Sequence, residues 1–207
     1  MKRTITFFTL LLMFCINAFA QETELSPDEM ESYKARCVEY INAFQKGLAT
    51  IADKGNSQKV KDHQKKVVLS FFMGKGEPYV DVDGKEYPAV KMEVSVARYG
   101  KVVDKNVKSL KQYLEDLQNL PYVSVKMTQA HTCVVSNLYP VPGAKDRYQA
   151  TVSFFQYFEG AKGDGRFYRD RTQKDVQVFL TKVTDGNLGT FWDLKFGDIN
   201  VVETIRL

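Results

Sequence analysis

The hydrophobic pattern of this chain changes its period, and this change limits the folds that the chain can adopt. Apolar residues recur in steps of three and four over 30–51, 60–72 and 107–117, which predicts three amphipathic helices. From residue 122 onward they recur at every second position, which predicts β-strands. Helices followed by strands indicate an α+β fold, in which the helices pack on one face of an antiparallel sheet.

The first two predicted helices have clear start and stop signals. Ser26 is followed by a proline and by Glu29, which is the pattern of an N-cap with a capping box. This helix should end near Gly55. Ser57 can cap the second helix, which should end at Gly74.

A hairpin is predicted between the second and third helices. Asp83-Gly84 is a dipeptide typical of a tight turn, and it separates 79–82 from an alternating stretch at 90–96. We expect these two stretches to pair. The third helix should contain Val107 and end at Pro121, because proline cannot continue a helix.

Four long strands should follow, at 122–138, 147–159, around 176–180 and at 192–201. Long antiparallel strands twist and coil, so the sheet should curve around the helices. The expected order is α-α-β-β-α-β-β-β-β, with three helices from the N-terminal half packed in the concavity of a strongly curved antiparallel sheet. With no repeat and no linker, 21–207 should form a single domain.

The first twenty residues have the pattern of a cleavable export signal. Lys2 and Arg3 precede an apolar run, and the small-residue site Ala18-Phe19-Ala20 precedes Gln21. The apolar run is too short to span a bilayer, and no later segment approaches the required length. We therefore expect residues 1–20 to be removed and the remaining chain to act in the periplasm or outside the cell.

Export and composition together exclude several classes of function. Outside the cytoplasm the protein has no supply of ATP or nicotinamide cofactors. Removing Lys2 and Arg3 lowers the formal net charge from +4 to +2, which is too little to steer nucleic acids. The chain contains no G-x-S-x-G elbow, no H-E-x-x-H and no Walker loop. We expect no cofactor, no nucleic-acid partner and no membrane span.

Cys37 and Cys133 are the cysteines that follow the predicted signal. In an oxidising compartment they can form a disulfide, which would stabilise the fold by about 4–5 kcal/mol before strain. They can equally be buried as small apolar side chains. The sequence leaves both interpretations open. These cysteines and the two isolated histidines lack the spacing of metal ligands, so no metal site is expected.

Aromatic residues make up 13% of the chain and supply the candidate binding residues. Phe155 and Tyr157 lie on the strand face opposite Phe154 and Phe158. One of these faces must pack on the helices, and the other can line a cavity or contact a protein. Phe191 lies near a predicted turn. We therefore take Phe155, Tyr157 and Phe191 as candidates for binding.

Three features of the sequence carry a resemblance. The segment Trp192-Asp193-Leu194-Lys195-Phe196-Gly197-Asp198-Ile199-Asn200-Val201 resembles an ending, W-x-V/L-x-hydrophobic-G-D-I-x-V, of exported bacterial proteins of unknown function. The segment 170–176 also resembles those proteins. The order of predicted elements resembles the nuclear-transport-factor-2-like (cystatin-like) cone, in which a bent sheet wraps the helices and leaves a cavity at its open end. The resemblance implies this fold, an envelope location and a homodimer through the outer sheet face, but no activity.

Two functions are consistent with these features. The leading hypothesis is a non-enzymatic envelope protein that binds a small apolar ligand in the cone cavity or binds a partner protein. The alternative is a lyase, isomerase or hydrolase in which His131 acts with an aspartate supplied by the fold. Enzymes of the cone family place an aspartate or an Asp-His pair in the cavity. Asp170, Asp175 and Asp193 are the aspartates that the fold could bring to His131.

Overall fold

The computed structural model describes residues 24–207, apart from 82–83, 99–100 and 145. Of residues 98, 101–103 and 129–132 it describes the backbone alone. The export signal expected at 1–20 lies outside the described residues and stays a prediction.

The described residues form three α-helices, and the N-caps of the first two follow the sequence signals. They are α2 (Pro27–Ala52), α3 (Gln58–Ser70) and α4 (Leu110–Gln118). The capping box is confirmed: the Ser26 side chain accepts a hydrogen bond from the Glu29 amide at 3.3 Å, and the Glu29 carboxylate accepts one from the Ser26 amide at 2.9 Å. Within the described part of the chain, no helix is long and apolar enough to cross a membrane.

The predicted hairpin pairs differently from expectation. After a short 3₁₀ helix, η2 (Met73–Gly76), strand β1 (Tyr79–Val80) pairs with β2 (Glu86–Tyr87) and not with 90–96. The backbone amide of Asp81 donates to the Lys85 carbonyl at 2.9 Å. A turn this tight brings the nearest residues together first, so the stretch at 90–96 is left for another partner.

The stretch at 90–96 pairs instead with a strand whose last residues were predicted to be helical. Strand β3 (Lys91–Arg98) pairs antiparallel with β4 (Lys101–Ser109), so Val107 belongs to a strand and not to the third helix. The helix begins only at Leu110, since the Ser109 side chain caps it by accepting from the Gln112 amide at 3.2 Å. The start predicted for this helix was therefore wrong.

The main sheet contains β3, β4 and five later strands. These are β5 (Ser124–Val135), β6 (Tyr139–Pro140), β7 (Arg147–Ala161), β8 (Phe167–Asp185) and β9 (Gly189–Arg206). The strand order is β4-β3-β9-β8-β7-β5, with β6 beside β7. Strands β3 and β9 run parallel, whereas the other pairs are antiparallel. The sheet is thus mixed, which corrects the expectation of a purely antiparallel sheet.

Strands β3 and β9 are joined largely by hydrogen bonds between side chains and backbone amides. In the described residues these strands share one register pair, Met92 with Ile199. The Asp198 carboxylate accepts from the Lys91 amide at 2.8 Å, and the Glu93 carboxylate accepts from the Val201 amide at 2.7 Å. These carboxylates satisfy strand amides that a regular ladder would pair with carbonyls.

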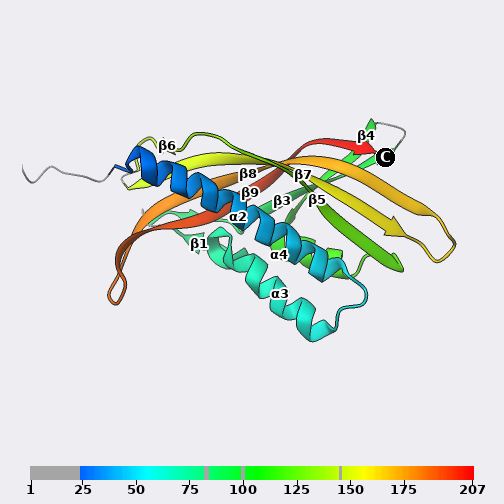
Figure 1. Cartoon of the computed structure of the whole chain (residues 1–207). Helices are drawn as coiled ribbons and strands as arrows, with labels where there is room; N and C mark the ends of the chain where they lie inside the picture. The colour runs from blue at the N-terminus through cyan, green and yellow to red at the C-terminus, as the bar shows by residue number, and fades with distance from the viewer. Residues whose placement is uncertain (1–23, 82–83, 99–100, 145) are drawn as a thin grey trace, which may run out of the picture.

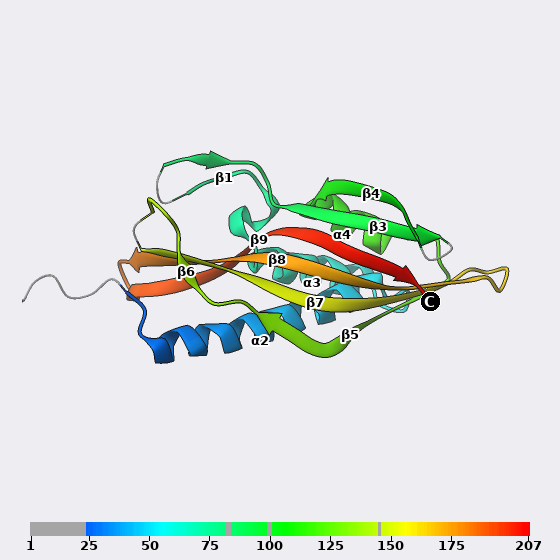
Figure 2. The same ribbon diagram turned by 90° about the horizontal axis from the view of Figure 1, so that it is seen from above.

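The three helices lie on the same side of the sheet (Figures 1 and 2). Between them and the sheet is a core whose centre is aromatic. The Phe72 ring contacts the rings of Phe44 and Phe196 edge-on, with centroids 5.3 and 5.5 Å apart. All three side chains are fully buried. Rings packed in this way contribute about 0.5–1.5 kcal/mol per pair beyond their burial.

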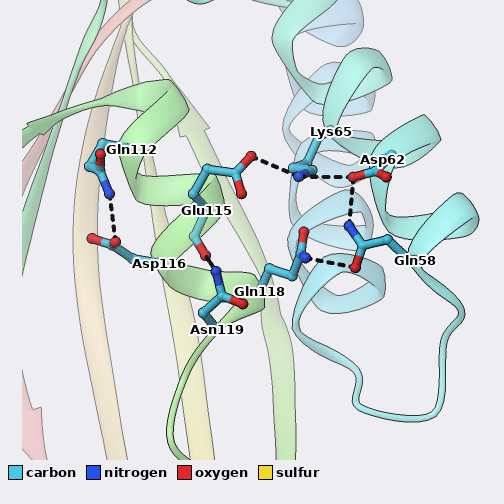
Figure 3. A network of polar contacts seen from close by, with 8 residues as sticks. All are labelled: Gln58, Asp62, Lys65, Gln112, Glu115, Asp116, Gln118 and Asn119. Carbon is cyan, nitrogen blue, oxygen red and sulfur yellow. Dashed lines mark hydrogen bonds and ion pairs between the residues drawn. The ribbon is translucent and has the colours of Figure 1, made fainter.

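A polar network joins α3 to α4 (Figure 3). Lys65 Nζ bridges the carboxylates of Asp62 at 3.0 Å and Glu115 at 2.7 Å. The Gln118 side-chain amide donates to the Gln58 side-chain carbonyl at 2.8 Å. Because these contacts fix α4 from its outer side, its opposite face can serve as a stable wall.

Candidate functional site

The inward face of β8 changes from apolar to polar halfway along the strand. Leu180, Val178 and Val176 are buried in the core on this face. Lys174, Thr172 and Asp170 continue the same face, are also buried, and line a cavity. An inward strand face that turns polar has left the apolar core, because buried polar groups need partners or a ligand.

This cavity has a volume of about 950 Å³ and lies between α4 and the polar half of the sheet. Leu117 and Leu120 form the wall on the α4 side. Val94 from β3, Met127 from β5 and Phe158 from β7 supply apolar surface on the sheet side. The volume is in the range of small-molecule sites.

Lys174 occupies the inner end of the cavity, below α4. Its Nζ lies 5.5 Å from the ring centroid of Tyr113, and the residue is only 4% exposed. It makes no hydrogen bond or ion pair with the side chains that the structure describes. Burial lowers the pKa of Lys174 to about 8, against the opposing effect of the Asp170 charge.

Asp170 lies further toward the mouth. Burial raises the pKa of this carboxyl above its ordinary value, while hydrogen bonding to Tyr168 and Thr172 and the nearby charges of Lys174 and Arg206 act in the opposite direction. Burial, together with Asp170, raises the pKa of Tyr168 to about 12. Asp170 is therefore a buried carboxyl whose desolvation outweighs the favourable effects of its neighbours.

Aromatic rings form the outer part of the cavity. Phe158 contacts Tyr122 and Tyr168, with ring centroids 5.6 and 5.9 Å apart. Gly160 lies under the first of these rings, and a Cβ there would be 2.7 Å from Tyr122. The close approach of Tyr122 to β7 thus requires glycine. The guanidinium of Arg206 lies 3.9 Å from the Tyr168 ring centroid, a cation–π contact.

The predicted binding residues lie elsewhere. Phe155 and Tyr157 project from the opposite face of β7 to Phe158 and Gln156, and Arg171 lies 5.1 Å from the Phe155 ring centroid. Phe191 pairs with Val183 beside the β8–β9 turn and is 38% exposed. None of Phe155, Tyr157 and Phe191 is among the described residues that line the cavity. As a contact surface they stay a prediction.

The candidate residues of the enzyme alternative are only partly described. His131 belongs to β5, but its side chain lies outside the described part of the chain. Of the three aspartates, Asp170 lines the cavity. Asp175 accepts from Ser153 Oγ at 2.6 Å on the outer face, and Asp193 lies 3.6 Å from Lys195 Nζ. A pair between His131 and Asp170 stays a hypothesis.

Cys37 and Cys133 are free thiols in the structure. Cys37 is fully buried on α2, and Cys133 is half-buried on β5. Burial raises the pKa of Cys37 to about 12, and the proximity of Cys133 adds to this effect. Both side chains belong to the core between the helices and the sheet. Whether they pair in an oxidising compartment stays a prediction.

Sequence reasoning missed Lys174, Tyr113 and Tyr168. The usable signal is the phase of β8, since positions 168, 170, 172 and 174 share the face of Val176 and Val178. Lysine in phase with a core stripe indicates a buried cation. Tyr113 carries no comparable signal, because aromatic residues on an amphipathic helix are ordinary core residues.

The described residues contain no group of three or more His, Cys, Asp and Glu side chains that could hold a metal ion. Comparison of the chain with models of protein families, with curated proteins and with solved structures finds no match in any of the three.

Proposed function

We propose that this protein is an exported, non-enzymatic binding module of the nuclear-transport-factor-2-like class, which holds a small molecule in the cavity between α4 and the sheet. In this proposal the three helices occupy the concavity of a strongly curved sheet, and the cavity lies at its open end. The observation that carries the proposal is the cavity itself, with its volume of about 950 Å³ and its apolar walls.

The packing around the cavity supports a site that is formed before ligand arrives. The network around Lys65 holds α4, and the contact between Tyr122 and Gly160 fixes the mouth. A preformed site loses little conformational entropy when it binds, so modest contacts suffice for affinity. This argument favours a small molecule over a protein partner as the primary ligand.

Filling the cavity tests the proposal. Val94 lines the cavity and is half-buried, so Val94→Trp should place an indole in the space and weaken binding of the uncharged dye Nile red at least tenfold. The measurement is a fluorescence titration of the purified protein.

Val202→Trp is the matched control, because Val202 is 48% exposed and lies outside the described cavity lining. We expect this variant to bind Nile red as the wild type does. Equal binding by wild type and Val94→Trp, with both variants folded by circular dichroism, would refute the cavity as the binding site.

A further inference from the structure

The inner end of the cavity holds a cation that forms no ion pair with the described residues. Lys174 is 4% exposed and contacts the face of the Tyr113 ring, but no carboxylate of the described residues lies within ion-pair distance of its Nζ. Burying a charge is costly unless it is paired. A cavity that contains such a cation should therefore bind a negatively charged ligand more tightly than a neutral one.

The acidic side chains of the cavity are already engaged. Asp116 pairs with Lys108 and accepts from the Gln112 side chain at 2.8 Å. Asp170 lies near the charges of Lys174 and Arg206, which favour its ionised form, although burial still raises the pKa of this carboxyl. The described lining holds five basic side chains and two acidic ones, so the cavity favours an anion over a cation; the basic residues are Lys108, Lys162, Arg166, Lys174 and Arg206.

The contacts favour a carboxylate head group over a phosphate. The Arg206 guanidinium is engaged at the Tyr168 ring and donates to the Phe167 carbonyl at 3.0 Å. Lys174 is thus left as a single point charge at the inner end. One lysine matches one negative charge, whereas phosphate sites usually combine several donors.

The path from Lys174 to the mouth is apolar on two sides. Leu117 of α4 and Leu120, just after this helix, line it on one side, and Met127 and Phe158 line it from the sheet. A hydrocarbon chain or ring system placed there would lose its contact with water on binding, which favours association.

From this arrangement we infer that the ligand is an organic carboxylate with an apolar body, whose head group binds Lys174 Nζ and whose body lies between α4 and Phe158. The inference rests on the proposed function and narrows the ligand class, which the sequence had suggested to be simply apolar.

The test compares three probes of equal length: dodecanoate, dodecanamide and dodecylamine, each measured by displacement of Nile red at pH 7. Wild type should bind dodecanoate at least tenfold more tightly than the amide, and should bind the amine most weakly. Lys174→Met should remove the preference for dodecanoate over the amide, while Lys174→Arg should retain most of it.

Lys162→Met is the control, because Lys162 lines the cavity but is exposed. It should keep the preference for the acid. Equal affinity of wild type for acid and amide, or a preference that survives in Lys174→Met, would overturn the inference while leaving cavity binding intact. If Nile red does not bind, or binds Val94→Trp as well as wild type, the proposed function itself fails.

Discussion

Lys174→Met should raise the free energy of unfolding at pH 7 by about 1–3 kcal/mol, although it removes the group proposed to bind ligand. The physical reason is that Lys174 is charged at pH 7 in a site where burial lowers its pKa to about 8. The unfolded chain binds this proton more tightly than the folded protein does. Methionine fills a similar volume and carries no charge to desolvate.

The sign of the pH dependence follows from the same shift. Below pH 8 both states bind the proton, and the wild type bears the full cost of the buried charge. Between pH 8 and about 10.5 the folded protein loses the proton first, so wild-type stability rises and the advantage of Lys174→Met shrinks. Urea denaturation at pH 7 and pH 10 measures both effects.

The tyrosines near Lys174 do not contribute to the change of stability expected between pH 8 and about 10.5. The groups that face Lys174 are Tyr113 and Asp116 on α4, Lys108 on β4, Asp170 and Tyr168 on β8, and Arg206 on β9. Burial raises the pKa values of both tyrosines, so they stay neutral over this range. Lys162→Met should not raise the free energy of unfolding at pH 7. A Lys174→Met variant less stable than wild type at pH 7 would mean that the charge is compensated in the folded protein.

The second large effect concerns a buried ion pair at the opposite end of the sheet from the cavity mouth. Asp81→Ala should lower the free energy of unfolding by about 3–5 kcal/mol. The Arg147 guanidinium binds the Asp81 carboxylate, and the side chains of both are almost fully buried, at 6% and 2% exposed. Arg147 also lies 4.8 Å from the Phe179 ring centroid. Without Asp81, the Arg147 guanidinium would be a buried charge that has lost its carboxylate partner.

A double variant separates the cost of the unpaired charge from the value of the pair. Asp81→Ala combined with Arg147→Met removes both charges, and it should recover a large part of the loss in Asp81→Ala. Strictly additive losses in a urea-denaturation cycle would show that the two residues act independently. The exposed pair Arg166–Asp164 supplies a control, since Asp164→Ala should leave the free energy of unfolding almost unchanged.

The sequence predicted those elements whose local signals agree with their tertiary environment. The helix capped by Ser26 and the strands around Val152, Val176 and Leu194 each have a clear period and clear ends. The β4 strand was missed because Val107 falls in phase with Leu110 and Leu114 of α4. Only the pairing with β3 decides its conformation, and that pairing is a long-range contact that no window of sequence contains.

The candidate site was predictable only in part, for a different reason. The aromatic residues of β7 led to the prediction that Phe155 and Tyr157 bind a ligand. The cavity, however, is lined by the other face of that strand. The choice between faces depends on which one the helices cover, and both faces carry aromatic side chains. Lys174 was overlooked because its neighbours in sequence are polar, so that only the strand phase marks it as buried.

The contact between β3 and β9 affects how readily the backbone amides of these strands exchange with solvent. Most of the main sheet is closed by backbone ladders, whereas this seam has one register pair and is held by Asp198, Glu93 and a hydrogen bond between the Ser95 and Thr204 hydroxyls. Protonating or replacing either carboxylate would release strand amides without disturbing β7 and β8. The β3–β4 arm, which carries Val94 in the cavity wall, is therefore the part of the sheet whose amides should exchange with deuterium at the lowest opening energy.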